Sequence, residues 1–211
     1  MSPIRAICFD LDGTLYDLPK MKRRLWASML RHPRVLSAWQ KETEAIRGQR
    51  HTDIHGWVAE QVAEKIGIES SKAAAIIQKV IFETYPSKFA PSDLLPGLQA
   101  LFDEIDQRGI LRAVVSDHPV EKKLAGLAQS AGWACRIDCS ALGAMKPLPD
   151  GLFKAAEAMH LKVEDLILIG DRENTDGEMA ANAGIPALIR HRDWDNVADL
   201  KTSLLGILEQ Q

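Results

Sequence analysis

The stretch that decides the fold reads Ile-Arg-Ala-Ile-Cys-Phe-Asp-Leu-Asp-Gly-Thr and occupies residues 4–14. Residues 4–9 are mostly apolar and predict a short buried strand, which Gly13 and Thr14 end. Asp10 and Asp12 therefore follow the carboxyl end of a strand, and open α/β sheets bind their ligands at that edge. A pair of carboxylates at this position indicates a site for chemistry on charged groups.

The composition is that of an ordinary globular protein, with 46% hydrophobic and 26% charged residues in a chain of 211. This length is enough for one large core, or for a core with a smaller appended unit. The net charge of -3 gives no positive field that would attract a polyanion, so nucleic acid is not an expected partner.

The termini and the cysteines favour a cytoplasmic protein with no membrane partner. The N-terminal residues lack the regions of a signal peptide, and no apolar run approaches the roughly 18 residues of a membrane span. Cys8, Cys135 and Cys139 are an odd number, and Cys8 lies in the predicted first strand. We therefore expect no disulfide framework.

Residues 17–89 show helical periods and no buried strand, which predicts a helical unit inserted after the first strand. One helix is expected from Thr52-Asp53 to Gly67, and Ser70 is expected to cap the next one. Trp26, Trp39 and Trp57 lie in this segment and are expected to form its own small core. The predicted division is an α/β core of residues 1–16 and 90–211 and a helical cap of residues 17–89.

From residue 96 onward helical and strand patterns alternate, which predicts a doubly wound parallel sheet of the α/β class. The expected strands after the first lie at 110–115, 134–137, 166–169 and 185–189. The expected helices lie at 98–108, 119–131, 150–159, 175–183 and 196–210.

Four polar clusters fall just after predicted strands, and a doubly wound sheet would gather them at one edge. The clusters are Asp10 with Asp12, then residues 116–119 (Ser-Asp-His-Pro), then Lys146-Pro147, then residues 170–176 (Gly-Asp-Arg-Glu-Asn-Thr-Asp). Carboxylate oxygens are good ligands for Mg²⁺, and lysine neutralises phosphate oxygens. The edge is therefore suited to a divalent cation and a phosphoryl group.

In this order the clusters resemble the four motifs of the haloacid dehalogenase (HAD) superfamily, and the chain looks like its C1-capped, phosphoglycolate phosphatase-like branch. The resemblance implies that Asp10 is the nucleophile, which forms an aspartyl-phosphate, and that Asp12 is the general acid and base. It also implies that Mg²⁺ is held by the Asp10 side chain, the Asp12 carbonyl and Asp171. Asp176 would orient a metal-bound water or the lysine.

The same resemblance implies that Ser116 hydrogen-bonds a phosphate oxygen and that Lys146 balances the charge of the nucleophile and the transition state. This chain departs from many relatives at Asp117 and His118, beside the phosphate pocket. For Asp117 we favour a cap on the helix after Pro119 over a substrate contact. For His118 we favour a surface histidine over a donor to the substrate.

The insertion resembles the C1-type cap of the superfamily, which limits access chiefly to small phosphorylated molecules and excludes water on closure. Residues 46–51 lie where such caps often carry a substrate-facing loop. Arg47 or Arg50 could meet a second anionic group of the substrate there, and the alternative is a solvated turn between helices.

The predicted function is Mg²⁺-dependent hydrolysis of a small phosphate monoester. Asp12 favours phosphoryl transfer, because the dehalogenases of the family resemble one another in lacking it. A phosphomutase and a catalytically silent binding protein of the same fold are the alternatives, and a receiver-type signalling module fits the motif order less well. Phosphoglycolate, sugar phosphates and nucleoside monophosphates all remain open as substrates, as do a monomer and a homodimer.

Overall fold

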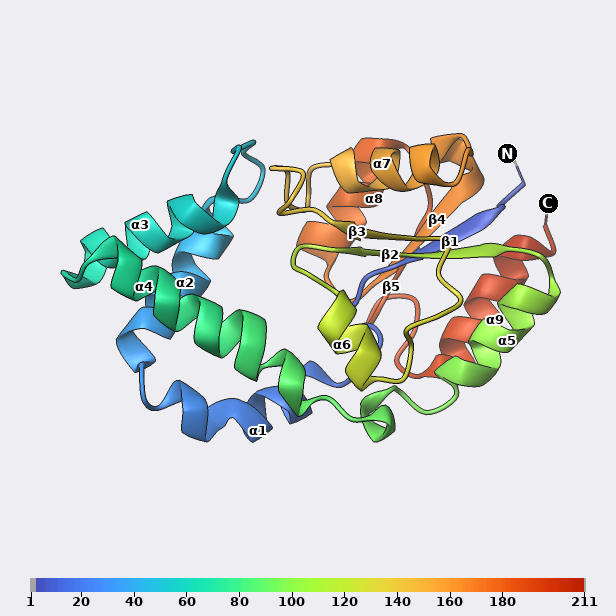
Figure 1. Cartoon of the computed structure of the whole chain (residues 1–211). Helices are drawn as coiled ribbons and strands as arrows, with labels where there is room; N and C mark the ends of the chain where they lie inside the picture. Colours follow the sequence, from blue (N-terminus) through green and yellow to red (C-terminus); the bar gives the residue numbers. More distant parts are fainter. Residues whose placement is uncertain (1–2, 211) are drawn as a thin grey trace.

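The centre of the computed structural model, which describes residues 3–210 without the side chains of residues 27–29, is a parallel sheet (Figure 1). Within the described residues it has five strands in the order β3-β2-β1-β4-β5. They are β1 (Ala6–Phe9), β2 (Leu111–Ser116), β3 (Cys135–Asp138), β4 (Leu166–Gly170) and β5 (Ala187–Ile189). The predicted doubly wound parallel sheet is confirmed, and each predicted strand overlaps an observed one.

The strand register brings the functional segments to one edge. Phe9 at the end of β1 pairs with Val114 of β2 on one side and with Ile169 of β4 on the other. The hydrogen bond from Asp10 N to Ile169 O, at 2.8 Å, continues this pairing one residue beyond the strand. The residues that follow β1, β2 and β4 therefore leave the sheet side by side.

Alternate residues of β1 face two separate apolar layers, as the two-residue period of a strand requires. Ile7 and Phe9 pack with α5 (Leu98–Gln107), α6 (Glu121–Gly126) and α9 (Val197–Leu208). Ala6 and Cys8 pack with α7 (Asp150–Ala158) and α8 (Glu178–Ala183) on the other face (Figure 1). Every residue of β1 is buried, which explains its continuous apolar sequence.

The segment after β1 is helical and returns to the sheet through short turns. It contains α1 (Leu18–Met29), α2 (Pro33–Ala45), α3 (Ile54–Ile66), α4 (Ser70–Ile77) and a π-helical continuation of α4, η1 (Gln78–Thr84). The short helical turns η2 (Pro86–Lys88) and η3 (Pro91–Asp93) precede α5, η4 (Val163–Asp165) precedes β4, and η5 (Glu173–Gly177) precedes α8. We call α1–α4 with η1 the cap. Its division from the core at residues 17–89 stays a prediction.

The predicted ends of α3 and the predicted cap of α4 have different outcomes. The Asp53 side chain accepts a hydrogen bond of 2.8 Å from Gly56 N, and Gly67 ends α3 with a φ of 73°, so both predicted ends of this helix are confirmed. The prediction that Ser70 caps the next helix is wrong. Helix α4 already begins at Ser70, and Glu69 precedes it without a side-chain cap.

The expected end of α6 and the expected burial of Trp26 are both wrong. Helix α6 ends at Gly126 rather than near residue 131, because Ala128 takes a left-handed φ of 57°. Trp39 and Trp57 pack against the apolar cluster of the cap, but Trp26 is 62% exposed and does not belong to it. Among residues 3–210, no helix combines the length and the apolar character that crossing a membrane would need.

Candidate active site

A buried lysine lies at the centre of the carboxyl edge of the sheet. Lys146 Nζ donates hydrogen bonds of 2.6 Å to Asp10 Oδ1 and 2.6 Å to Asp176 Oδ1. Asp10 follows β1, Asp176 lies in η5 and Lys146 lies between β3 and α7, so three segments supply this group. Burial acts to lower the pKa of Lys146, but Asp10 and Asp176 outweigh it and raise that pKa well above its usual value. Lys146 is therefore charged.

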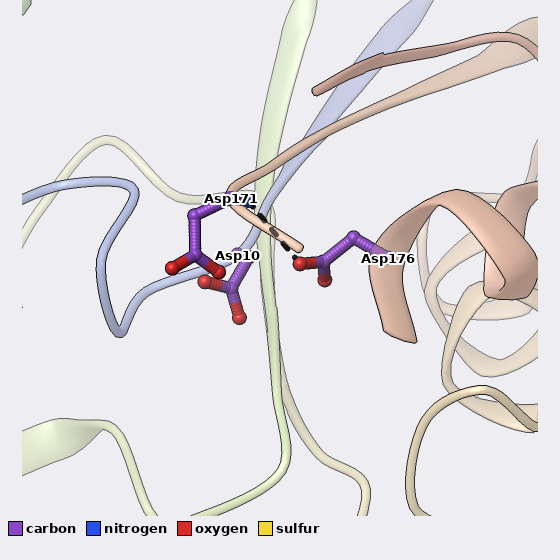
Figure 2. A group of neighbouring side chains, drawn as sticks. All are labelled: Asp10, Asp171 and Asp176. Carbon is purple, nitrogen blue, oxygen red and sulfur yellow. Dashed lines mark hydrogen bonds between the residues drawn. The ribbon is translucent and has the colours of Figure 1, made fainter. Parts of the chain in front are cut away.

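Three carboxylates surround this lysine closely enough to hold one metal ion. Each of Asp10, Asp171 and Asp176 offers an oxygen atom within 4.8 Å of the other two (Figure 2). Burial is the main cause that raises the pKa of Asp10, and the neighbouring aspartates add to it against Lys146. Burial and then Asp176 raise the pKa of Asp171 to about 6. This crowded set of hard oxygen donors fits Mg²⁺, which would relieve the repulsion.

The approach of these carboxylates requires glycine at two positions. A Cβ atom at Gly13, where φ is 100°, would lie 2.2 Å from Asp171 Oδ2. A Cβ atom at Gly170 would lie 2.4 Å from the Cβ of Asp176. Thr14, buried beside Gly13, donates a hydrogen bond of 3.0 Å to Asp10 Oδ2. The Gly-Thr that ends the first strand thus also shapes the site.

Asp176 has protein partners on both carboxylate oxygens. Its Oδ1 accepts from Lys146, and its Oδ2 accepts bonds of 3.2 Å from the backbone N-H groups of Asp171 and Arg172. It therefore holds the turn after β4 and the lysine in place. This arrangement is compatible with the predicted orienting role, and the Asp12 carbonyl as a metal ligand stays a prediction.

Asp12 lies in a separate network from Asp10. Lys123 Nζ donates to both of its carboxylate oxygens at 2.7 and 2.6 Å, and the Tyr16 hydroxyl donates to Oδ1. The hydroxyl groups of Tyr16 and Tyr85 also form a hydrogen bond with each other. Burial acts to raise the pKa of Asp12, but Lys123 and Tyr16 outweigh it and lower that pKa below its usual value. Asp12 is a carboxylate in this structure.

Sequence reasoning missed these partners of Asp12. Lys123 lies in a predicted helix whose charged residues are usually solvated, yet its side chain is only 5% exposed. Lys123 and Asp12 are 111 positions apart, so no local period connects them. Tyr16, four residues after Asp12, is the one partner that spacing alone could have suggested.

Asp117 joins the core to the cap, and the prediction that it caps the next helix is wrong. Val120 precedes α6 and makes no side-chain cap. The Asp117 carboxylate instead accepts from Lys146 N at 2.9 Å and from Arg47 Nη1. Ser116, the residue before it, is buried and lines the same cavity as Asp10. Asp117 is thus held by partners that fix the loop carrying Lys146.

The two candidate arginines of the cap lie in different places. Arg47 lines the cavity and is committed to Asp117, to the Lys146 carbonyl at 2.9 Å, and to Glu44 at 3.0 Å. Arg50 lies on the surface with 66% of its side chain exposed and pairs with Asp150 at 2.9 Å. The structure brings Arg47 to the site and does not bring Arg50 there. A substrate contact by either arginine stays a prediction.

A cavity of about 530 Å³ lies between the carboxyl edge of the sheet and the cap. Asp10, Asp12, Ser116, Lys146 and Asp171 line its core side. The described residues therefore place most of the predicted catalytic and metal-binding side chains around one space. Its volume is typical of a site for one small molecule.

His118 also lines this cavity, and the interpretation of it as a surface histidine is wrong. Its ring centroid lies 5.8 Å from that of Trp39 and 5.9 Å from that of Phe82. Burial and then Lys123 lower the pKa of His118 to about 4. The imidazole is therefore neutral near pH 7.

Comparison with known proteins agrees with this geometry. A family model for haloacid dehalogenase-like hydrolases matches residues 4–184. The match covers the sheet up to β4, the cap and all of the clustered polar residues. The chain therefore belongs to the haloacid dehalogenase-like hydrolases.

Solved structures of several activities share the fold. The chain is similar to a β-phosphoglucomutase from Clostridium difficile, with a TM-score of 0.73, 16% identity and coverage of 98% of this chain and 97% of that one. For a 2-haloacid dehalogenase from Pseudomonas syringae pv. Tomato DC3000 the TM-score is 0.64 and the identity 18%, with coverage of 97% of this chain and 99% of that one. For a predicted phosphoglycolate phosphatase from Haemophilus somnus 129pt the TM-score is 0.61 and the identity 18%, with coverage of 96% of this chain and 98% of that one. At these identities the likeness concerns the fold, and the reaction has to be argued from the site.

Proposed function

We propose that this protein is a Mg²⁺-dependent phosphatase that hydrolyses a small phosphorylated metabolite through an aspartyl-phosphate. The observation that carries the proposal is the pair of aspartates with different partners in one cavity. Asp10 is bonded to the buried Lys146, and Asp12, two residues on, is bonded to Lys123. This difference in partners supports a nucleophilic role for Asp10 and a proton-moving role for Asp12.

In the first step an oxygen of Asp10 attacks phosphorus, and the bond from phosphorus to the ester oxygen breaks. Asp12 gives its proton to that leaving oxygen, and Lys146 balances the charge on the equatorial oxygens. Asp12 must therefore gain a proton before this step. The charge of the incoming phosphate favours this gain, because a neighbouring anion raises the pKa of a carboxyl group.

In the second step water attacks phosphorus, and the bond from phosphorus to Asp10 breaks to release inorganic phosphate. Asp12 takes the proton of the water, and for this it must be a carboxylate. Lys123 and Tyr16 favour that charged form. Ser116, buried at the edge of the cavity, would donate to a phosphate oxygen.

Asp10, the Asp12 carbonyl and Asp171 would hold Mg²⁺, with Asp176 fixing the turn that carries Asp171. When bound, the ion would neutralise phosphate charge and reduce repulsion between the nucleophile and the substrate. The crowding of three carboxylates within 4.8 Å supports this assignment.

A phosphomutase remains the second candidate, because one similar structure is a β-phosphoglucomutase. The two reactions differ in the acceptor of the phosphoryl group, which is water in hydrolysis and a substrate hydroxyl in the mutase. A non-catalytic binding protein is the third. The presence of both aspartates and of the buried lysine supports catalysis.

The test is a screen of phosphate monoesters with and without Mg²⁺ that measures inorganic phosphate and, separately, positional isomers of each ester. We expect Mg²⁺-dependent phosphate release that the Asp10→Asn variant lacks. The matched control is Asp150→Asn, because Asp150 is also a core aspartate but bonds the surface Arg50. Isomers without phosphate release would favour the mutase, and turnover retained by Asp10→Asn would contradict the mechanism.

A further inference from the structure

Part of the cavity lining is built from aromatic and imidazole rings. Trp39 of α2, His55 of α3 and Phe82 of η1 line it, together with His118 of the core. The ring centroids of His55 and Phe82 lie 4.6 Å apart, and the rings of His55 and His118 stack with centroids 6.0 Å apart. Rings from three cap elements thus meet at one part of the cavity lining.

Two polar atoms in this wall lack hydrogen-bond partners within the described residues. They are Thr43 Oγ1 and His118 Nδ1, and both atoms are buried. Thr43 and His118 also both line the cavity. A buried polar atom without a partner costs free energy, so a ligand that bonds these atoms after a small side-chain rotation would recover that cost. An apolar wall with a few converging polar groups is the usual composition of a small-molecule site.

The buried cations that line the cavity already have partners among the described residues. Lys146 bonds Asp10 and Asp176, and Lys123 bonds Asp12. Arg47, whose side chain is only 15% exposed, bonds Asp117. Among the described residues, the other cations of the lining are Arg172, which is 40% exposed and pairs with Glu44 at 3.0 Å, and the exposed lysines Lys22 and Lys122. The interior of the cavity therefore favours a leaving group without a second charge.

We propose that the leaving group of the substrate is a flat, uncharged ring that lies against Trp39 and Phe82. The ring carries a hydrogen-bonding substituent that reaches Thr43 Oγ1 or His118 Nδ1. The inference rests on the proposed phosphatase function and names the class of substrate for that site. It disfavours phosphoglycolate and small acyclic phosphates.

The first experiment compares phosphate esters that all leave as alcohols, so that leaving-group chemistry stays similar. The wild-type protein is assayed with Mg²⁺ on three esters, and kcat/KM is measured for each. The esters are benzyl phosphate, glycerol 3-phosphate and phosphoglycolate. We expect benzyl phosphate to be preferred by about tenfold or more, because a stacked ring adds to its area burial. An equal rate for all three, or a preference for phosphoglycolate, would overturn the inference.

The second experiment separates ring contact from stability of the cap. Trp39→Leu and Phe82→Leu should each lower kcat/KM for benzyl phosphate about fivefold and leave that for glycerol 3-phosphate within about twofold. The control is Trp57→Leu, because Trp57 packs against the same apolar cluster of the cap but does not line the cavity. Equal losses on both esters, or an equal effect of Trp57→Leu, would show a structural role only and contradict the inference.

The third experiment tests the unpartnered hydroxyl with a change that keeps side-chain shape. We expect the wild type to prefer 3-hydroxybenzyl phosphate over benzyl phosphate, and we expect Thr43→Val or His118→Phe to abolish that preference. The folded state is checked by thermal unfolding. If the preference is absent in the wild type, or persists in Thr43→Val and in His118→Phe, the polar part of the inference fails.

A binding measurement keeps the inference independent of turnover. Calorimetry with Mg²⁺ compares benzylphosphonate and methylphosphonate, which cannot be hydrolysed. We expect benzylphosphonate to bind about tenfold more tightly than methylphosphonate, and we expect Phe82→Leu to remove this difference. That result supports the ring site even if no ester is hydrolysed. In that case only the proposed phosphatase function fails. If all esters are hydrolysed but the two phosphonates bind with equal affinity, the ring site is contradicted and the phosphatase function is not.

Discussion

The core side and the cap side of the cavity differ in how far their polar groups are satisfied. On the core side Lys146, Asp176 and Asp12 all have charged partners at hydrogen-bond distance. On the cap side Thr43 Oγ1 lacks a partner within the described residues and the surroundings are largely apolar. The chemistry is therefore organised before any ligand arrives, whereas recognition is left for the ligand to complete.

The largest expected effects come from removing the two aspartates that follow the first strand, the proposed nucleophile and the proposed proton-moving group. Asp12→Ala should lower kcat by about 10²–10⁴-fold, the usual contribution of a general acid or base. Steady-state kinetics on the best ester of the screen measures it. The Asp10→Asn variant should be inactive in the same assay, and an Asp12→Ala variant with near wild-type kcat would remove Asp12 from the mechanism.

The next effect concerns the metal and follows from the raised pKa of Asp171. A carboxyl group whose pKa rises from 3.8 to about 6 on folding destabilises the metal-free fold as pH rises through that range. Mg²⁺ binds the deprotonated group, so its stabilisation appears as pH rises above about 6. At 100 times its dissociation constant Mg²⁺ should add about 3 kcal/mol, or several degrees in melting temperature, at pH 7.5.

Thermal unfolding with and without Mg²⁺ at pH 4.5 and pH 7.5 measures this difference. The shift should be small at pH 4.5 and should disappear at both pH values in Asp171→Asn, while Asp150→Asn should keep the wild-type response. A shift of the same size at both pH values would contradict the assignment of Asp171 as a ligand.

A smaller effect is expected from substitution of Lys123, which bonds Asp12 but not Asp10 and lowers the pKa of Asp12. Lys123→Met removes the positive charge that lowers the pKa of Asp12, so that pKa should rise. The base form of Asp12 then appears only at higher pH, so the acidic limb of the plot of kcat against pH should move to higher pH. A shift of one pH unit corresponds to about a tenfold loss on that limb. An unmoved limb would mean that another group controls it.

The smallest effects concern the contacts between cap and core. Arg47→Ala breaks the largely buried pair with Asp117 and should lower kcat/KM by about tenfold, because a largely buried charged bond is worth more than an exposed one. Arg50→Ala breaks an exposed pair and should change kcat/KM by less than about twofold. KM and kcat for both variants are compared on one ester. Equal losses would show that burial does not distinguish the two contacts.

The sequence predicted the core side better than the cap side for a physical reason. Apolar runs that end in polar residues locate the strands, and a parallel sheet then brings Asp10, Lys146 and Asp171 to one edge. This inference needs only local patterns and topology. It therefore held for every strand of the described sheet.

The partners of these residues depend on packing between distant segments. Lys123 and Asp117 each bond groups far away in the sequence, and periodicity carries no information about such pairs. Trp26 has the same composition signal as Trp39 but lies exposed. The ring-lined wall could therefore be seen only once the cap helices were placed.

The residue before the central lysine has a consequence for how the cap and the core work together. Met145 is buried in the apolar cluster of the cap, although it belongs to the chain segment of Lys146. The cap thus packs directly on the backbone that carries the lysine. If the cap lifts, that segment loses its packing at the same moment as the cavity opens. Opening of the cavity and alignment of Lys146 are therefore expected to change together.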